Sequence, residues 1–515
     1  MTPRNSQVTR WTLTAIIIMS TLPIPLHTYA AHQQVLHLPP PLITPTALPV
    51  PNATTPYWTR YLSKDHTPSL DHGSKGPLTK DADICIIGSG ITGVSAAYHL
   101  YKAVVQDGRP LNVVILEARE FCSGATGRNG GHLTPHAFAH FTTLSKRFGK
   151  EDAIRSLELE RYTSTEIRKI LAESGKTDDV DMVSDGRVIL LFSKEEEELT
   201  RVEFDAAKEA GIDVSEVEWF SREETQERYG ASYPSVKIPG NNVWPLKLVS
   251  HLYNLASSSS SSFNLTLHTH TPVTSISTTT TPNPAHRKVT LQTPRGEITC
   301  SAVLHATNGY ASHLLPFFHG EIVPTRGQVI SVRANTPSPF GKGREGFVGN
   351  DGFEYWFPRP KSVKRDDYAE GEEERELVIL GGGREAAKNG KFEFYTVDDS
   401  VVNPEVGKVV RGFLPAVFPG RFDNGTEPEM EWTGIMGYTR SGEPFVGPVI
   451  DSTGRRYPGQ YISAGYTGHG MPRAFACAEM IAGMILADLN GEGWHRPEWF
   501  PTHYLTDNRT IGQYV

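Results

Sequence analysis

A glycine-rich turn between an apolar strand pattern and a helix pattern constrains this chain more than any other feature. The apolar run at 83–87 leads directly into 88–93, which reads Gly-Ser-Gly-Ile-Thr-Gly. Residues 91–104 then have the apolar spacing of a helix, and 112–117 form a second apolar run. A strand, a crossover helix and a parallel strand fit this order, so the segments predict a βαβ unit. The fold class expected from it is α/β, with a Rossmann-like domain.

The positions of these glycines have a physical meaning at a dinucleotide site. Gly88 permits the tight turn, Gly90 lets a pyrophosphate approach the backbone, and Gly93 lets the helix pack against the strand. The free N–H groups and the dipole at the start of the helix favour a diphosphate. Glu117 ends the second strand, where an acid accepts hydrogen bonds from a ribose diol. The motif predicts a dinucleotide but does not choose between NAD and FAD.

Length, charge and cysteine content exclude several classes of protein. A chain of 515 residues with 38% hydrophobic residues has room for two intertwined domains and is not a small disulfide scaffold. Its 50 basic and 58 acidic residues give a net charge of −8, so nucleic acid is not expected as a partner. The four cysteines show no CxxC spacing and the histidines are scattered, so no metal site is expected. Cys85 and Cys477 lie in apolar patterns that predict buried free thiols.

The first thirty residues have the pattern of a secretory signal peptide. Arg4 and Arg10 precede an apolar stretch at 11–26, and small residues up to Ala30 fit a cleavage site. Two prolines interrupt the stretch, which is shorter than the roughly 20 residues that a bilayer span needs. We therefore expect a removed leader, a secreted protein and no stable membrane span. An uncleaved anchor, or a start codon upstream of the true one, remains an alternative. Four N-x-[ST] sequons fit a glycoprotein: Asn52, Asn264, Asn424 and Asn508.

The remaining chain divides into an arm, two interleaved domains and a tail. Residues 31–80 are rich in Pro, Thr and Ser without a helix or strand period, which predicts a leader or a surface-wrapping arm. Helix patterns at 137–175 and 195–211 and later strand patterns indicate a dinucleotide-binding domain interleaved with a mixed α+β substrate domain. The predicted boundaries are 81–180, 246–317 and 411–490 for the first domain, 181–245 and 318–410 for the second, and 491–515 for the tail.

Further segments resemble the D-amino acid oxidase superfamily of FAD-dependent amine and amino-acid oxidoreductases. Residues 123–132 (SGATGRNGGH) are similar to its flavin-proximal loop, and 322–328 (IVPTRGQ) to its P-x-R-G-Q segment. Residues 303–310 resemble the strand and turn that close on the cofactor, and 432–448 and 465–471 (GYTGHGM) resemble the C-terminal flavin segment. The similarity spans about 81–490 and is greatest to the γ-glutamylputrescine oxidase-like branch. It implies that the Rossmann-like domain binds FAD.

The resemblance also implies roles for residues at matching positions. Thr126 would offer its hydroxyl to the pyrophosphate, and the amides of 468–471 would face the pyrimidine edge of the flavin. The expected cofactor-binding residues are Gly88, Ser89, Gly90, Ile91, Thr92, Gly93, Glu117, Ala118, Arg119, Gly124, Ala125, Thr126, Asn129, Gly130, Gly131, Val273, Thr307, Gly468, Gly470 and Met471. The expected catalytic residues are Arg128, His132, Tyr355 and His469. Pairing of Arg128 with a core acid, and backbone contacts of the two histidines, remain alternatives.

The reaction implied by the resemblance is oxidation of the carbon–nitrogen bond of a small-molecule amine or amino acid to an imine. Dioxygen would be the acceptor and hydrogen peroxide the product. No cysteine stands at 434–437, and Arg128 replaces the glycine-loop histidine, so non-covalent FAD is expected. A carboxylate on the substrate would need an arginine, for which Arg359, Arg384 and Arg440 are candidates. A dehydrogenase with another acceptor, and a secreted flavin-binding glycoprotein without turnover, are the alternatives. The oligomeric state is not indicated.

Overall fold

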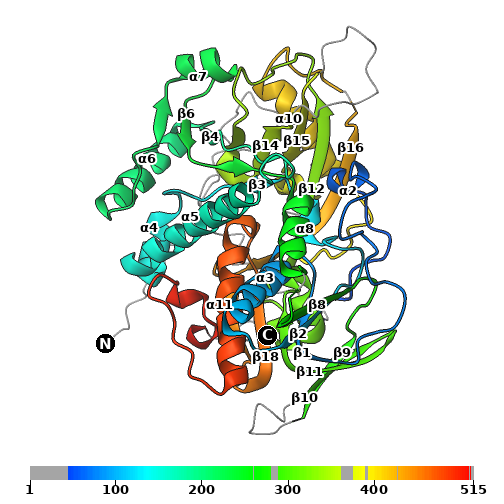
Figure 1. Ribbon diagram of the computed structural model, residues 1–515. Coiled ribbons are helices and arrows are strands. Elements are labelled where there is room, and N and C mark those ends of the chain that lie inside the picture. Colours follow the sequence, from blue (N-terminus) through cyan, green and yellow to red (C-terminus); the bar gives the residue numbers. More distant parts are fainter. Residues whose placement is uncertain are drawn as a thin grey trace, which may run out of the picture.

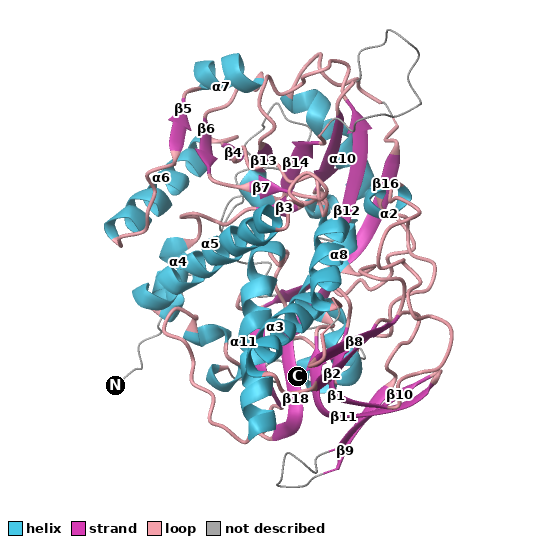
Figure 2. Ribbon diagram, in the orientation of Figure 1, coloured by secondary structure: helices cyan, strands magenta, loops and turns pink. Residues whose placement is uncertain are grey.

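The computed structural model describes residues 45–258, 260–279, 288–360, 375–388, 392–425, 427–509 and 511. The predicted signal peptide, and the arm up to residue 44, lie outside the described residues. Figures 1 and 2 show two sheet-containing halves with long helices packed against and between them.

The first sheet contains the predicted βαβ unit. β1 (Asp81–Ile87), α3 (Ile91–Asp107) and β2 (Leu111–Leu116) follow one another, and β1 pairs in parallel with both β2 and β11 (Gly296–His305). The strand order is β17-β18-β11-β1-β2-β8. β10 pairs with the first half of β11 outside this order, and β9 pairs with β10. The other strands are β8 (Phe263–His268), β9 (Ser275–Thr279), β10 (Lys288–Thr293), β17 (Phe445–Ile450) and β18 (Arg456–Ala464). Because the order reverses at β1, the carboxyl ends of β1 and β11 form the edge where such sheets bind ligands.

Apolar helices cover this sheet and complete its core. α3 packs against α8 (Pro245–Ala256) and α11 (Met471–Asn490), and α11 also contacts α5 (Lys150–Glu173). Small residues that are fully buried allow close helix packing. They are Ala96 and Ala97 on α3 and Ala474, Ala476 and Ala478 on α11. The helix predicted at 137–175 is instead two helices, α4 (Phe141–Phe148) and α5. Gly149 separates them with a φ of +88°, a conformation that ends the first helix.

The second sheet is antiparallel except where β13 runs parallel to β4. Its order is β16-β12-β15-β14-β13-β4-β6-β5. These strands are β4 (Arg187–Leu190), β5 (Glu218–Phe220), β6 (Ser235–Ile238), β12 (Ile322–Arg333), β13 (Gly346–Gly349), β14 (Glu354–Pro358), β15 (Leu377–Gly381) and β16 (Met430–Thr439). α6 (Lys194–Glu209), α7 (Arg222–Tyr229) and α10 (Pro404–Val417) belong to this half, as Figure 1 shows.

The sheet pairing differs from the predicted domain boundaries at one place. The segment 411–490 was expected to belong wholly to the dinucleotide-binding domain. However, β16 pairs with β12 over ten successive residues, and α10 packs against β12. This long antiparallel ladder places 411–439 with the second sheet, and the chain returns to the first sheet only at β17.

The arm and the tail are integral parts of the fold. The arm contains a short helix, α2 (Tyr57–Arg60), which buries Trp58 completely. The indole nitrogen of Trp58 donates to the carbonyl of Asn129 (2.7 Å), so the arm fixes the predicted flavin-proximal loop. In the tail, Phe500 and Tyr504 are fully buried. Most described residues of the arm lie at the surface, and buried residues such as Trp58 anchor the arm to the rest of the fold.

Two further predictions concern the burial of the cysteine thiols and the absence of a membrane-spanning helix. All four cysteines are free and buried, which confirms the prediction for Cys85 and Cys477. Among the described residues, no helix has both the length and the apolar character that a membrane crossing requires.

Candidate functional site

A cavity of about 630 Å³ joins the carboxyl ends of β1 and β11 to the second sheet. Every predicted site residue lines it except Ser89, Gly93 and Gly131. The cavity also receives Leu48 and Pro49 from the arm, the start of α11, and side chains from β4, β14 and β16. The structure therefore brings together in one place segments that lie far apart in the sequence.

Each glycine of the fingerprint meets a different steric requirement. Gly88 has a φ of +110°, and a Cβ there would lie 2.8 Å from the carbonyl oxygen of Ala306. A Cβ on Gly93 would lie 2.0 Å from the carbonyl oxygen of Gly88, so any side chain would separate α3 from β1. Gly90 faces the cavity, and its Cβ would be 3.1 Å from the hydroxyl of Thr126. Gly93 therefore serves packing, whereas Gly88 and Gly90 shape the cavity wall.

Hydrogen bonds around Glu117 connect the fingerprint to the glycine loop. Its carboxylate accepts the backbone N–H (2.9 Å) and hydroxyl (2.8 Å) of Ser89, and the N–H of Arg119 (3.1 Å). The hydroxyl of Thr126 accepts the N–H of Ile91 (3.1 Å). Ser89 is fully buried, so it orients Glu117 and does not face the cavity, contrary to its expected contact with the cofactor.

The polar lining fits a bound dinucleotide. The hydroxyl of Thr307 is buried at the cavity and has no hydrogen-bond partner among the described residues. Glu117, at the end of β2, lines the same wall with its carboxylate only partly used by protein donors. Val273, which the resemblance places on the adenine side, lines the cavity too. Orphaned polar groups, a glycine-lined wall and a carboxylate are the features that a ribose and pyrophosphate require.

The start of α11 offers fewer donors than expected. Pro472 has no N–H, and the N–H groups of Arg473 and Ala474 donate to the carbonyl of Gly470 (3.2 and 2.8 Å). The N–H groups left in this turn are those of Gly470 and Met471, and both residues line the cavity.

Arg128 is held by a buried acid from the other half of the molecule. Its Nε lies 3.4 Å from Asp399, whose carboxylate also binds Arg119 through two contacts (2.9 and 3.1 Å). Arg128 also donates to the carbonyl of Thr433 (2.6 Å) and to Thr54 of the arm. Burial lowers the pKa of Arg128 to about 10, which Asp399 opposes. These contacts support the alternative of a core ion pair for Arg128.

His132 and Arg187 form an unpartnered polar wall of the cavity. Both ring nitrogens of His132, and the Nε of Arg187, are buried without a hydrogen-bond partner among the described residues. Burial lowers the pKa of His132 well below its ordinary value, with a smaller effect from Arg187. Burial lowers the pKa of Arg187 to about 10, so its guanidinium is protonated at neutral pH. A buried cation without a partner favours an anionic ligand group.

Tyr355 lies opposite the glycine loop. A Cβ on Gly130 would lie 2.3 Å from its ring, and a Cβ on Gly381 would lie 2.4 Å from it. Both glycines are therefore required to seat the ring, and burial raises its pKa to about 12. The rings of Tyr355 and His132 meet edge-on, with their centroids 5.6 Å apart.

Of the three arginines predicted as partners for a substrate carboxylate, the structure places one at the cavity and two away from it. Arg384 lines the cavity and donates to the hydroxyl of Tyr438 (2.8 Å). Arg359 instead pairs with Asp181 and stacks near Trp58 and Trp244, away from the cavity wall. Arg440 donates to the carbonyl of Gly320 (3.1 Å) and does not line the cavity either.

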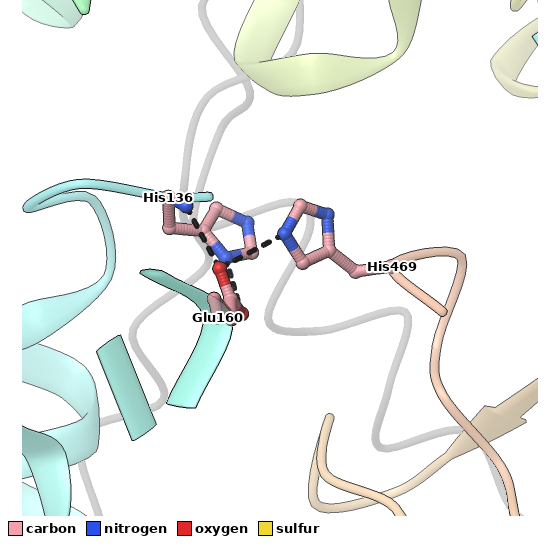
Figure 3. A group of neighbouring side chains, drawn as sticks. All are labelled: His136, Glu160 and His469. Carbon is pink, nitrogen blue, oxygen red and sulfur yellow. Dashed lines mark hydrogen bonds and ion pairs between the residues drawn. The ribbon is translucent and has the colours of Figure 1, made fainter. Parts of the chain in front are cut away.

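His469 belongs to a cluster that the sequence did not predict (Figure 3). The carboxylate of Glu160 on α5 accepts from His136 (3.1 Å), His469 (3.1 Å) and Arg473 (2.7 Å), and the two imidazoles stack at 3.7 Å. Burial alone would raise the pKa of Glu160, but these three groups hold it well below its ordinary value. Burial lowers the pKa of His136 to about 4, against the effect of Glu160. Burial also lowers the pKa of His469, so the environment favours the neutral form of both imidazoles.

The same three side chains have the spacing of a metal-binding group. However, the guanidinium of Arg473 occupies one oxygen of Glu160 and balances its charge. A cation placed between the imidazoles would be repelled by that guanidinium, so the cluster is better described as a hydrogen-bonded wall of the cavity. No ligand spacing in the sequence signalled it, because the three residues come from separate segments.

Comparisons with known proteins agree with this geometry. The family model described as FAD dependent oxidoreductase (DAO) matches residues 83–484. The "Probable oxidoreductase OrdL" of Rhizobium meliloti is 26% identical over 416 residues, covering 80% of this chain and 84% of that protein. The gamma-glutamylputrescine oxidoreductase of Escherichia coli is 38% identical over 71 residues, 14% of this chain and 15% of that protein.

Solved structures show the same fold at low sequence identity. Glycine oxidase from Geobacillus kaustophilus has a TM-score of 0.57 at 19% identity and covers 81% of this chain and 96% of its own. L-amino acid deaminase from Proteus vulgaris has a TM-score of 0.59 at 16% identity and covers 84% and 98%. With the family model matching most of its length, the chain belongs to the DAO family of FAD-dependent oxidoreductases.

Proposed function

We propose that this protein oxidises the carbon–nitrogen bond of a small amine or amino acid to an imine, with dioxygen as acceptor. The observation that carries the proposal is the single cavity, which extends from the dinucleotide turn to a wall containing His132, Arg187, Tyr355 and Arg384. The glycine turn at 88–93, Glu117 and Thr126 would hold FAD, which would supply two-electron redox chemistry: the carbon next to nitrogen would lose a hydride, and dioxygen would be reduced to hydrogen peroxide. The substrate nitrogen would lose its proton, and water would hydrolyse the imine.

The chain's own residues would bind and orient the substrate. Arg187 and Arg384 are guanidinium groups at the cavity wall that suit a carboxylate. Tyr355, seated between two glycines, presents a rigid aromatic face beside them. The fixed imidazoles of His136 and His469 line the wall next to the start of α11, where a neutral imidazole can accept a hydrogen bond from the substrate nitrogen. These contacts support oxidation of a nitrogen-containing molecule.

The decisive experiment is anaerobic mixing of the purified holoprotein with amines, N-methyl amino acids, and D- and L-amino acids. Bleaching of the flavin by at least one of them is expected, followed by reoxidation on admission of air with one hydrogen peroxide per turnover. Bleaching without oxygen consumption would favour the dehydrogenase alternative. A flavin that no compound bleaches would favour a binding protein without turnover.

Non-covalent attachment of FAD is part of this proposal. The four cysteines are buried and none lines the cavity. Acid precipitation should therefore release intact FAD into the supernatant. Yellow colour that stays with the pellet would contradict non-covalent binding.

We further propose that the protein enters the secretory pathway with its leader removed. The sequons at Asn52 and Asn424 lie on exposed loops, where a transferase could reach them. Mass spectrometry of protein secreted from a eukaryotic host should show a new N-terminus near residue 31 and a glycan on at least one of these sites. Cytosolic protein that retains Met1 would contradict the proposal.

A further inference from the structure

The outer part of the cavity contains carboxylates that the proposed reaction does not use. It is formed by α4, the first turns of α6 and the turn between β13 and β14. Leu199 and Val202 of α6 line it and are partly exposed, which places this part of the cavity next to solvent. The acidic residues that line it are Glu195, Glu196, Glu203 and Asp351.

Two of these acids have structural partners. Glu196 completes the capping box of α6 with Ser193 and also accepts the N–H of Asp351 (3.1 Å). Glu203 accepts the N–H of Thr142 at the start of α4 (2.8 Å). Folding therefore explains why Glu196 and Glu203 are present, although their charge still faces the cavity.

Asp351 is different because part of its carboxylate has no role in the fold. Its side chain is partly buried, and its buried Oδ2 has no hydrogen-bond partner among the described residues. Burial raises its pKa to about 7, and the neighbouring charges of Glu196 and Glu203 add to that effect. Burial likewise raises the pKa of Glu196 to about 7. A positive charge placed among these groups would relieve their repulsion.

The spacing of the acids favours an organic cation. Within the described part of the chain, only His136, Glu160 and His469 gather their ligand atoms as closely as a metal ion requires. The acids of the outer cavity are spread more widely around an open space with apolar walls, such as Leu190 and Leu199. An ammonium group on a methylene chain has matching chemistry, because its donors point in several directions and its stem is apolar.

We propose that this acidic part of the cavity binds the distal ammonium group of an amine substrate that carries two positive charges. The inference rests on the proposed function, since the other nitrogen must lie beside Tyr355 for oxidation. Tyr355 follows the β13–β14 turn closely and lines the same cavity as Asp351, so one extended ligand can contact both residues. Long diamines therefore fit this cavity better than monoamines.

The test compares α,ω-diamines of four to eight carbons with monoamines one carbon longer, in which a methyl group replaces the distal ammonium. Binding to the holoprotein is measured by anaerobic calorimetry and flavin reduction by stopped flow. At the preferred length, the diamine should bind at least about tenfold more tightly, the value of one hydrogen bond to a charged group. An amine with a distal carboxylate should bind more weakly than either.

Asp351→Asn is the diagnostic variant. Asp351 has a φ of +53°, which Asn tolerates well, so the change removes charge without backbone strain. The diamine-to-monoamine affinity ratio should fall about tenfold in this variant. Glu198→Gln is the matched control, because Glu198 lies exposed on the same helix as Glu196, pairs with Lys194 and does not line the cavity. Its affinity ratio should equal that of the wild type.

The outcomes separate this inference from the proposed function. Equal affinities for diamine and monoamine in the wild type, or an unchanged ratio in Asp351→Asn, would overturn the cation site. Charge-dependent diamine binding without flavin reduction by any amine would support the site and contradict amine oxidation. Reduction by monoamines alone would support amine oxidation and overturn the site.

Discussion

The carboxylate of Asp399 pairs with two buried arginines, one of which belongs to the glycine loop at 123–132. Asp399 is completely buried, and its carboxylate is the shared partner of Arg119 and Arg128. It lies between β15 and α10, in a stretch without regular secondary structure, so no periodic pattern marks it in the sequence. The sequence favours Arg128 as a catalytic residue because no motif identifies Asp399 as its ion-pair partner.

Asp399→Asn should lower the free energy of unfolding by about 3–5 kcal/mol, because two buried guanidinium groups would lose their counter-charge. Denaturant unfolding of the holoprotein measures this effect. Asp398→Asn is the control, since the Asp398 carboxylate accepts from the backbone and hydroxyl of nearby Ser400 and its loss should cost less than about 1 kcal/mol. Equal losses in the two variants would contradict the buried-pair interpretation.

Gly90→Val should abolish FAD binding and leave the protein folded. The new side chain would start 3.1 Å from the hydroxyl of Thr126 and extend into the space expected for the pyrophosphate. The flavin-to-protein absorbance ratio gives the loading, and circular dichroism checks the fold. Gly483→Ala on α11 is a suitable control, because its Cβ makes ordinary contacts (3.5 Å). A full flavin content in Gly90→Val would disprove the assignment of the fingerprint.

At the scale of elements, long apolar patterns were predicted well and short strands were not. The βαβ unit lies within a few residues of its predicted segments, since burial of both faces of β1 and β2 leaves continuous apolar runs. β5, β6 and β13 have only three or four residues each, too few for a period to be recognised. β13 also pairs in parallel with β4, a contact between segments more than 150 residues apart.

Some residues of the candidate site could also be predicted from the sequence, and others could not. The glycine turns could be predicted because steric demands select glycine locally, as at Gly88 and Gly130. Arg187, Glu160 and Asp351 could not, because each matters only through neighbours that other segments supply. Glu160 lies on a largely polar helix, where a charged residue normally faces solvent.

The first turn of α11 allows a test of backbone stabilisation. Gly470→Pro would remove one N–H at a φ of −74°, which proline adopts readily, whereas Gly470→Ala keeps the N–H and makes ordinary contacts (Cβ 3.4 Å from Tyr466). If this N–H stabilises negative charge that develops on the flavin, the proline variant should be reduced about 10² to 10³ times more slowly. Anaerobic stopped flow at equal flavin loading gives the rates. Equal rates in the two variants would show that the first turn of α11 contributes to packing and does not stabilise the reduced flavin.

At the scale of the whole molecule, the two sheets, the arm and the tail depend on one another. The arm binds the glycine loop through Trp58 and Thr54, and the tail binds α5 through a contact of His503 with Asp152 (3.1 Å). Because β16 and α10 belong to the second sheet and β17 to the first, the chain crosses between the halves repeatedly. The cavity therefore lies between parts that are expected to unfold together.

That shared stability should depend on pH through histidines buried as neutral groups. His305 on β11 is fully buried, bonds Gln460 through Nε2 (3.0 Å), and has a pKa lowered by burial to about 4. In the unfolded chain its pKa returns to about 6.5. Above pH 6.5 the ring is neutral in both states. Below that value the unfolded chain binds the proton and the folded protein does not, so stability falls until about pH 4.

The expected loss from this one group is about 1.4 kcal/mol per pH unit within that window. His305→Asn removes the titrating ring and should make the unfolding free energy fall less between pH 7.5 and 5.5, by about that amount, whatever its stability at pH 7.5. Denaturant unfolding of wild type and variant at both pH values measures the difference. The comparison is internal to each protein, so a cavity left by the smaller side chain does not affect it. Identical pH dependence in the two proteins would show that His305 takes up its proton without unfolding, for instance through water reaching β11.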